Sequence, residues 1–195
     1  LAASGRKALV PYVVAGDPDP AATVPLLHAL VAAGADILEL GVPFSDPMSE
    51  GPVIQKAHER SLARGTRLRA VLDMVREFRR DDADTPLLLM GYANPVEHMG
   101  YAAFADAAAA VGVDGLLTVD IPPEEVARVN RELTRVGMDN IFLVAPTTPE
   151  ARLDLITREA SGFIYYVSLK GVTGAGNLDV ADVGSHLAAI RRHTP

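Results

Sequence analysis

The sequence contains no cysteine. Disulfide bonds, thiolate catalysis and cysteine-ligated zinc or iron–sulfur sites are therefore excluded. A cytoplasmic enzyme fits this composition. The five histidines are not spaced as metal ligands, and no serine lies in a nucleophile-elbow pattern. We expect neither a metal site nor a covalent nucleophile.

The sequence also has fewer positively charged than negatively charged residues. The 18 Lys and Arg residues face 25 Asp and Glu residues, which gives a net charge of −7. This balance argues against a general nucleic-acid binder and against attraction to an anionic membrane. An acidic chain can still bind a phosphate locally, through backbone N–H groups at helix starts. No apolar run approaches the roughly 18 residues of a membrane helix, and Leu1–Lys7 lacks the features of a signal peptide.

What the sequence does contain is an alternation of short apolar runs and amphipathic stretches over residues 1–195, which indicates a single domain. Nearly continuous apolar runs are typical of strands that are buried on both faces of a parallel sheet. The expected strands lie within Ala8–Val14, Ile37–Val42, Leu87–Met90, Leu116–Val119, Ile141–Ala145 and Phe163–Leu169. The expected helices lie at Ala21–Ala33, from about Pro52, at Leu68–Phe78, at Tyr101–Val111, around Val126–Leu133, around Leu153–Ile156 and at Val180–Arg192.

A Gly-x-Asp repeat supports this pattern. It occurs at Gly34–Asp36, Gly112–Asp114 and Gly137–Asp139, each time between a helix and the next strand. Glycine there suits the left-handed residue that ends a helix. No Gly-x-Gly-x-x-Gly follows the first strand, so a (β/α)₈ TIM barrel is favoured over a dinucleotide-binding sheet. About six of the eight βα units are expected within the chain.

Glu39 is the most informative polar residue, because it lies inside an apolar run that should be a buried strand. A buried carboxylate needs a partner or a raised pKa. Near the C-terminal end of a strand, such a group could be a general acid or base close to neutral pH. Alternatively, Glu39 is a structural residue satisfied by a polar neighbour.

A second acidic residue, Glu50, lies in the proline-rich loop that follows this strand, just before a helix expected from Pro52. Barrels keep catalytic groups in loops of this kind. The other interpretation is that Glu50 complements the dipole of the helix. A third feature, Lys170–Asn177, has three glycines, which would suit a lid, a phosphate cradle or an ordinary flexible loop.

Taken together, these segments resemble the α subunit of tryptophan synthase along the whole chain. The most specific match is Glu39–Pro47, and the other matching segments occur in the expected order along the chain. They are Val10–Pro18, Gly51–Gln55, Tyr92–Pro95, Gly112–Gly115, Asp120–Pro122 and Gly171–Ala175.

The resemblance implies a (β/α)₈ barrel and a cofactor-free lyase that splits indole-3-glycerol phosphate into indole and glyceraldehyde 3-phosphate. It assigns acid–base catalysis to Glu39 and contact with the indole N–H to Glu50. It implies that Tyr12 and Tyr165 line the indole site. The remaining roles fall on Thr173, which meets the second carboxylate when a lid closes, and Gly174, which contacts the phosphate.

The resemblance also implies a partner, the pyridoxal-phosphate β subunit in an α2β2 heterotetramer, with Pro43 and Asp46 near the interface. This chain departs from the family at Glu50, where aspartate is usual, and at Ser49, where a small apolar residue is common. Two alternatives stay open. One is a non-catalytic fragment or pseudoenzyme that only binds the β subunit. The other is a different phosphate-sugar barrel, although the metal ligands or catalytic histidine expected of such enzymes are not seen.

Overall fold

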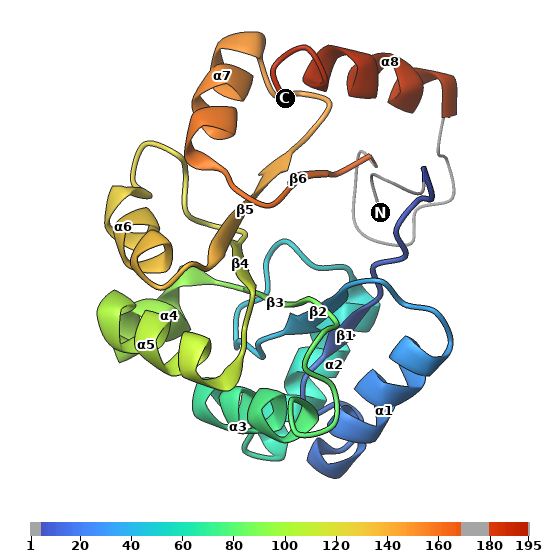
Figure 1. The fold of residues 1–195 in the computed structure, drawn as a ribbon, viewed down its shortest axis with the longest axis vertical. Coiled ribbons are helices and arrows are strands. Elements are labelled where there is room, and N and C mark those ends of the chain that lie inside the picture. The colour runs from blue at the N-terminus through green and yellow to red at the C-terminus, as the bar shows by residue number, and fades with distance from the viewer. Residues whose placement is uncertain (1–4, 169–179, 195) are drawn as a thin grey trace.

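The computed structural model describes residues 5–168 and 180–194, in which one parallel sheet has helices along its outer side (Figure 1). Each strand pairs with the next one in the sequence, so the strand order is β1-β2-β3-β4-β5-β6 and no strand is skipped. The strands are β1 (Tyr12–Val14), β2 (Leu38–Gly41), β3 (Leu87–Gly91), β4 (Gly115–Thr118), β5 (Asp139–Val144) and β6 (Ile164–Tyr166). Each of the six overlaps the apolar run that predicted it.

The helices are α1 (Pro20–Ala32), α2 (Pro52–Ala63), α3 (Leu68–Phe78), α4 (Ala93–Met99), α5 (Tyr101–Val111), α6 (Ala127–Arg135), α7 (Glu150–Glu159) and α8 (Val180–Ile190). The predicted limits of α3 and α5 agree with the structure. Helix α4 was not predicted. It is a short helix with Pro95 in its first turn, where a missing N–H costs nothing.

Six parallel strands in sequence order, separated by helices, form the arc of a (β/α)₈ barrel, and the predicted fold class is confirmed. Across the described ranges, no helix is both long enough and apolar enough to span a membrane.

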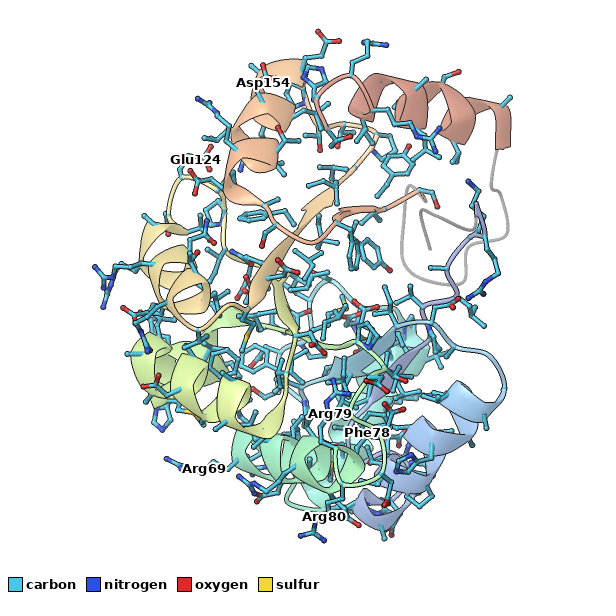
Figure 2. All side chains as sticks on the ribbon, in the orientation of Figure 1. Arg69, Phe78, Arg79, Arg80, Glu124 and Asp154 are labelled. Atoms are coloured by element: carbon cyan, nitrogen blue, oxygen red, sulfur yellow. The ribbon has the colours of Figure 1, made fainter. Side chains whose placement is uncertain are left out.

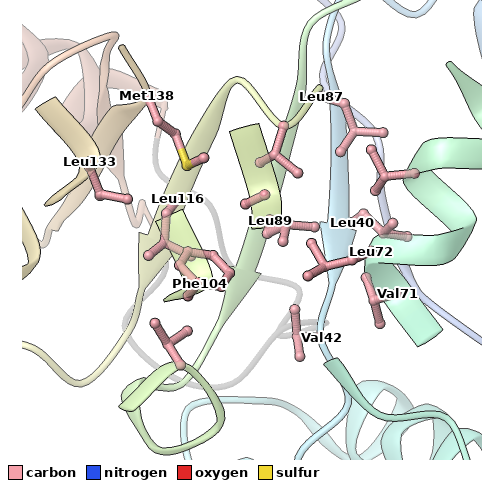
Figure 3. Close-up of a cluster of buried hydrophobic side chains, with 14 of the residues drawn as sticks. Leu40, Val42, Val71, Leu72, Leu87, Leu89, Phe104, Leu116, Leu133 and Met138 are labelled. Atoms are coloured by element: carbon pink, nitrogen blue, oxygen red, sulfur yellow. The ribbon is translucent and has the colours of Figure 1, made fainter. Parts of the chain in front are cut away.

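The alternation of side chains along each strand separates two apolar layers. Leu87 and Leu89 point outward and pack with the helices in the main core, shown in Figure 3. Leu88, between them, points to the inner face of the arc and packs with Leu117 and Ile141. Both faces of the strands are therefore buried, which explains why the runs in the sequence are continuous rather than alternating.

The Gly-x-Asp repeat lies at the N-terminal ends of the strands. Its three glycines have φ values of 103°, 88° and 74°, as expected for left-handed helix ends. In two of the three copies, the aspartate side chain accepts a hydrogen bond from the backbone of the segment that leads into, or begins, a neighbouring strand. Asp36 accepts the N–H of Leu9, and Asp114 accepts the N–H of Leu87, both at 2.8 Å.

Arg79 holds this end of the barrel together. Its guanidinium donates to the carbonyl oxygens of Gly112 at 2.9 Å and Thr85 at 2.7 Å, and to the carboxylate of Asp114 at 2.7 Å. The side chain is only 13% exposed. In Figure 2, Arg79 lies beside Phe78, whereas Arg80 points away from the protein.

Replacement of Arg79 by methionine is expected to lower the free energy of unfolding by about 2 kcal/mol. Methionine fills similar space but leaves the carbonyl groups of Gly112 and Thr85 without the guanidinium donor and removes the ion pair with Asp114. The matched control is Arg80→Met, which removes the same charge at an exposed position. Urea denaturation of the two variants measures the difference, and equal stabilities would contradict the role given to Arg79.

Candidate active site

A cavity of about 390 Å³ opens on the inner face of the arc, where the strands reach their C-terminal ends. Barrel enzymes place their active sites at this end. The cavity is lined by Tyr12, Glu39, Ser49, Glu50, Met90, Val119, Leu143, Val144, Ala145, Thr148, Tyr165 and Val167. Four of the six predicted site residues are among them. A larger hollow, of about 630 Å³, lies near Phe44, Arg67 and His98 and has no carboxylate in its lining, so the smaller cavity is the candidate active site.

Glu39 occupies the middle of β2 and points into this cavity. Its neighbours in register are Tyr12 on β1 and Leu88 on β3. It is 2% exposed, and its Oε1 has no hydrogen-bond partner within the described part of the chain. Burial, followed by the charge of Glu50, raises the pKa of Glu39 to about 7. The group can therefore both give and take a proton near neutral pH.

Glu50 lies at the end of the loop between β2 and α2 and is 8% exposed. Its backbone oxygen accepts a hydrogen bond from Gln55 Nε2 at 3.0 Å, which ties the end of the loop to α2. The positive end of a helix dipole would lower the pKa of a carboxyl group beside it. Burial instead raises the pKa of Glu50. Glu50 therefore holds its proton more readily than an exposed glutamate does.

Two phenols also line the cavity. Burial, with the charges of Glu39 and Glu50, raises the pKa of both Tyr12 and Tyr165. Both tyrosines therefore stay protonated at neutral pH and remain hydrogen-bond donors. The cavity combines two carboxyl groups, two phenols and apolar side chains, an arrangement suited to proton transfer on a partly apolar ligand.

Sequence reasoning missed two residues that shape the loop carrying Glu50. His58 accepts the N–H of Phe44 through Nδ1 at 3.0 Å. Tyr92 stacks on Phe44, with ring centroids 4.9 Å apart, and accepts the N–H of Ser49 through its hydroxyl at 3.0 Å. The Tyr92–Pro95 motif was a signal for Tyr92, but nothing in the sequence places His58 next to the loop.

The other two predicted site residues, Thr173 and Gly174, lie outside the described residues. In the ranges that the structure covers, no three His, Asp or Glu side chains gather as they would around a metal ion.

Comparison with known proteins identifies the family. The family model described as tryptophan synthase alpha chain matches residues 1–195. The chain belongs to the tryptophan synthase alpha chain family. It is 66% identical over 194 residues to the tryptophan synthase alpha chain of Thioalkalivibrio sulfidiphilus, covering 100% of this chain and 73% of that protein. The corresponding protein of Laribacter hongkongensis is 63% identical over 193 residues, covering 99% and 73%.

Solved structures of alpha chains have the same fold. The tryptophan synthase alpha subunit of Legionella pneumophila superposes with a TM-score of 0.92 at 46% identity, over 99% of this chain and 71% of that one. A chain from the tryptophan synthase α2β2 complex of Pyrococcus furiosus gives a TM-score of 0.88 at 41% identity, over 96% and 75%. The strand arc described above is thus that of a tryptophan synthase alpha chain.

Proposed function

We propose that this chain is a lyase that cleaves indole-3-glycerol phosphate into indole and glyceraldehyde 3-phosphate, in tryptophan biosynthesis. The observation that carries the proposal is the buried Glu39, which has a raised pKa and one carboxyl oxygen without a hydrogen-bond partner among the described residues, in a cavity with a second carboxyl group. Membership of the alpha chain family supports the choice of substrate.

The reaction needs one proton to be donated to the indole ring and another to be removed from the glycerol hydroxyl group. Glu39 in its acid form protonates C3 of the indole ring, which leaves a positive charge on the ring nitrogen. The carboxylate then removes the proton of the adjacent glycerol hydroxyl. A carbonyl group forms, the bond between C3 and the side chain breaks, and its electron pair neutralises the ring. Glu39 ends in its acid form, so one carboxyl group with a pKa near neutrality serves both steps.

Glu50 supplies the second charge. Its carboxylate accepts the indole N–H and stabilises the positive charge that develops on that nitrogen, as preorganised charges do in active sites. Tyr12 and Tyr165 contact the ring. The contacts proposed for Thr173, with the second carboxylate, and for Gly174, with the phosphate, follow from the family motif.

The proposed partner is a tryptophan synthase β subunit, in an α2β2 heterotetramer in the cytoplasm. The loop between β2 and α2 is suited to such a contact, since its Met48 is 76% exposed and Asp46 beside it is also exposed. Exposed apolar side chains with charged neighbours are common at protein interfaces. Co-elution of the two proteins on size-exclusion chromatography tests the association.

Indole formation from purified chain and indole-3-glycerol phosphate tests the activity. The chain is expected to release indole and glyceraldehyde 3-phosphate in equal amounts, and to do so without added metal or cofactor. Chain that co-elutes with the β subunit but releases no indole would support the alternative of a non-catalytic binding protein. The assay is run with and without β subunit, so that an enzyme needing its partner is not mistaken for an inactive one.

A further inference from the structure

His58 connects the loop that carries Glu50 with the wall of the cavity. It lies on α2 with 1% of its surface exposed. Its Nδ1 accepts the backbone N–H of Phe44, and its Nε2 lies 3.4 Å from the hydroxyl oxygen of Tyr12. Both nitrogens of a buried imidazole thus face polar atoms of other elements, one in the loop and one on β1.

The contact with Phe44 fixes which nitrogen carries the proton. A backbone amide can only donate, so Nδ1 must present its lone pair. Burial lowers the pKa of His58 and favours the neutral ring. In a neutral ring whose Nδ1 is bare, the single proton is on Nε2 and faces Tyr12. The Tyr12 oxygen therefore accepts from His58, and its own proton must point in another direction.

Among the described residues, the Tyr12 hydroxyl also lies near the backbone of β2 and the cavity. On one side, the hydroxyl packs against the backbone of β2 so closely that a Cβ added to Gly41 would lie 2.3 Å from its oxygen. Tyr12 also lines the cavity that holds Glu39 and Glu50, and the charges of both carboxyl groups raise the pKa of the phenol.

We propose that His58 is a positioning residue of the cleavage reaction: it holds the loop through Phe44 and turns the hydroxyl proton of Tyr12 into the cavity. Tyr12 then acts there as an oriented donor to a catalytic carboxylate or to the substrate. The kinetic part of this inference rests on the proposed function, whereas the proton positions do not.

The proton positions are tested by long-range nitrogen–proton NMR correlation spectra of the uniformly ¹⁵N-labelled chain at pH 7.5. Such spectra distinguish a protonated from a bare ring nitrogen, and the His58 signals are assigned by their loss in His58→Asn. We expect a bare Nδ1 and a protonated Nε2. We also expect the Nε2 signal to move in Tyr12→Phe, because that variant removes its acceptor. A protonated Nδ1, or an Nε2 chemical shift that does not change in Tyr12→Phe, would overturn the proposal.

The effect on the reaction is tested with a double-mutant cycle. Asparagine at position 58 places an oxygen where Nδ1 lies, so His58→Asn keeps an acceptor for Phe44 and loses only the contact with Tyr12. Each of His58→Asn and Tyr12→Phe is expected to lower kcat about tenfold, the effect of one hydrogen bond in the transition state, with little change in KM.

The double variant is expected to be no slower than either single variant, because both remove the same oriented donor. A purely structural His58 would instead give effects on kcat that multiply, and that outcome refutes the kinetic role. Thermal melts of all variants identify any loss through unfolding. If wild-type chain releases no indole, the proposed function fails, and the NMR spectra still decide whether His58 orients Tyr12.

Discussion

Glu39→Gln is expected to lower the rate of indole formation by about 10²- to 10⁴-fold, the contribution of a well-placed general acid–base group. Glutamine keeps the shape of the side chain but can neither protonate C3 of the indole nor remove the hydroxyl proton. Steady-state assays of indole release measure the loss. The control is Glu77→Gln on the exposed face of α3, which makes the same chemical change outside the cavity.

The same variant should have a distinctive effect on stability. The pKa of Glu39 in the folded chain, about 7, lies above its ordinary value of 4.5. Between these values the folded chain holds a proton that the unfolded chain has lost, so wild-type stability falls as the pH rises through this window. Glutamine has no such titration. Relative to wild type, Glu39→Gln should therefore gain about 1 to 3 kcal/mol between pH 4.5 and pH 8.

Urea denaturation at pH 5 and pH 8 tests this gain, and the two readouts together are specific. If Glu39 only supported the fold, Glu39→Gln would lower the free energy of unfolding, and the molecules that stay folded would still release indole at the wild-type rate. Indole release within tenfold of the wild-type rate would remove Glu39 from its proposed role, whatever its effect on stability.

The position of Glu39 could be predicted from the sequence, but its neighbours could not. A carboxyl group in the middle of Ile37–Val42 must be buried if the run is a strand, and the strand follows from local composition. The contact between His58 and Phe44 depends on how α2 packs against the loop that precedes it. The periodicity of the sequence does not predict this packing. The cavity itself joins residues from β1 to β6, and only the closure of the sheet into an arc brings them together.

The same distinction holds for the fold. Helix α3 has a strongly amphipathic pattern, and its limits were predicted correctly. Helix α4 has one buried residue, Val96, and a proline in its first turn, so neither periodicity nor propensity indicates it. The strand predicted within Ala8–Val14 is shorter in the structure, because it begins only at Tyr12, after Pro11.

Glu50 gives the second large effect. Glu50→Gln is expected to lower the rate of indole formation by about 10²-fold, because a neutral amide cannot stabilise the charge that develops on the indole nitrogen. It should also shift the pH profile of kcat/KM. The charge of Glu50 is one cause of the raised pKa of Glu39, so its removal lowers that pKa. The variant should then lose activity at a lower pH than wild type as the pH rises.

Glu50→Asp distinguishes charge from reach. It keeps the carboxylate and restores the residue that is usual in the family, so activity is expected to stay the same or rise. Any gain is limited by Ser49, which stands where a small apolar residue is common and can have adapted to the longer side chain.

If Glu50 only complemented the dipole of α2, Glu50→Gln would cost some tenths of a kcal/mol of stability and little activity. Assays of indole formation and thermal melts on both variants decide between these roles. Near wild-type turnover in Glu50→Gln would show that one carboxyl group, Glu39, is sufficient for the reaction in this chain.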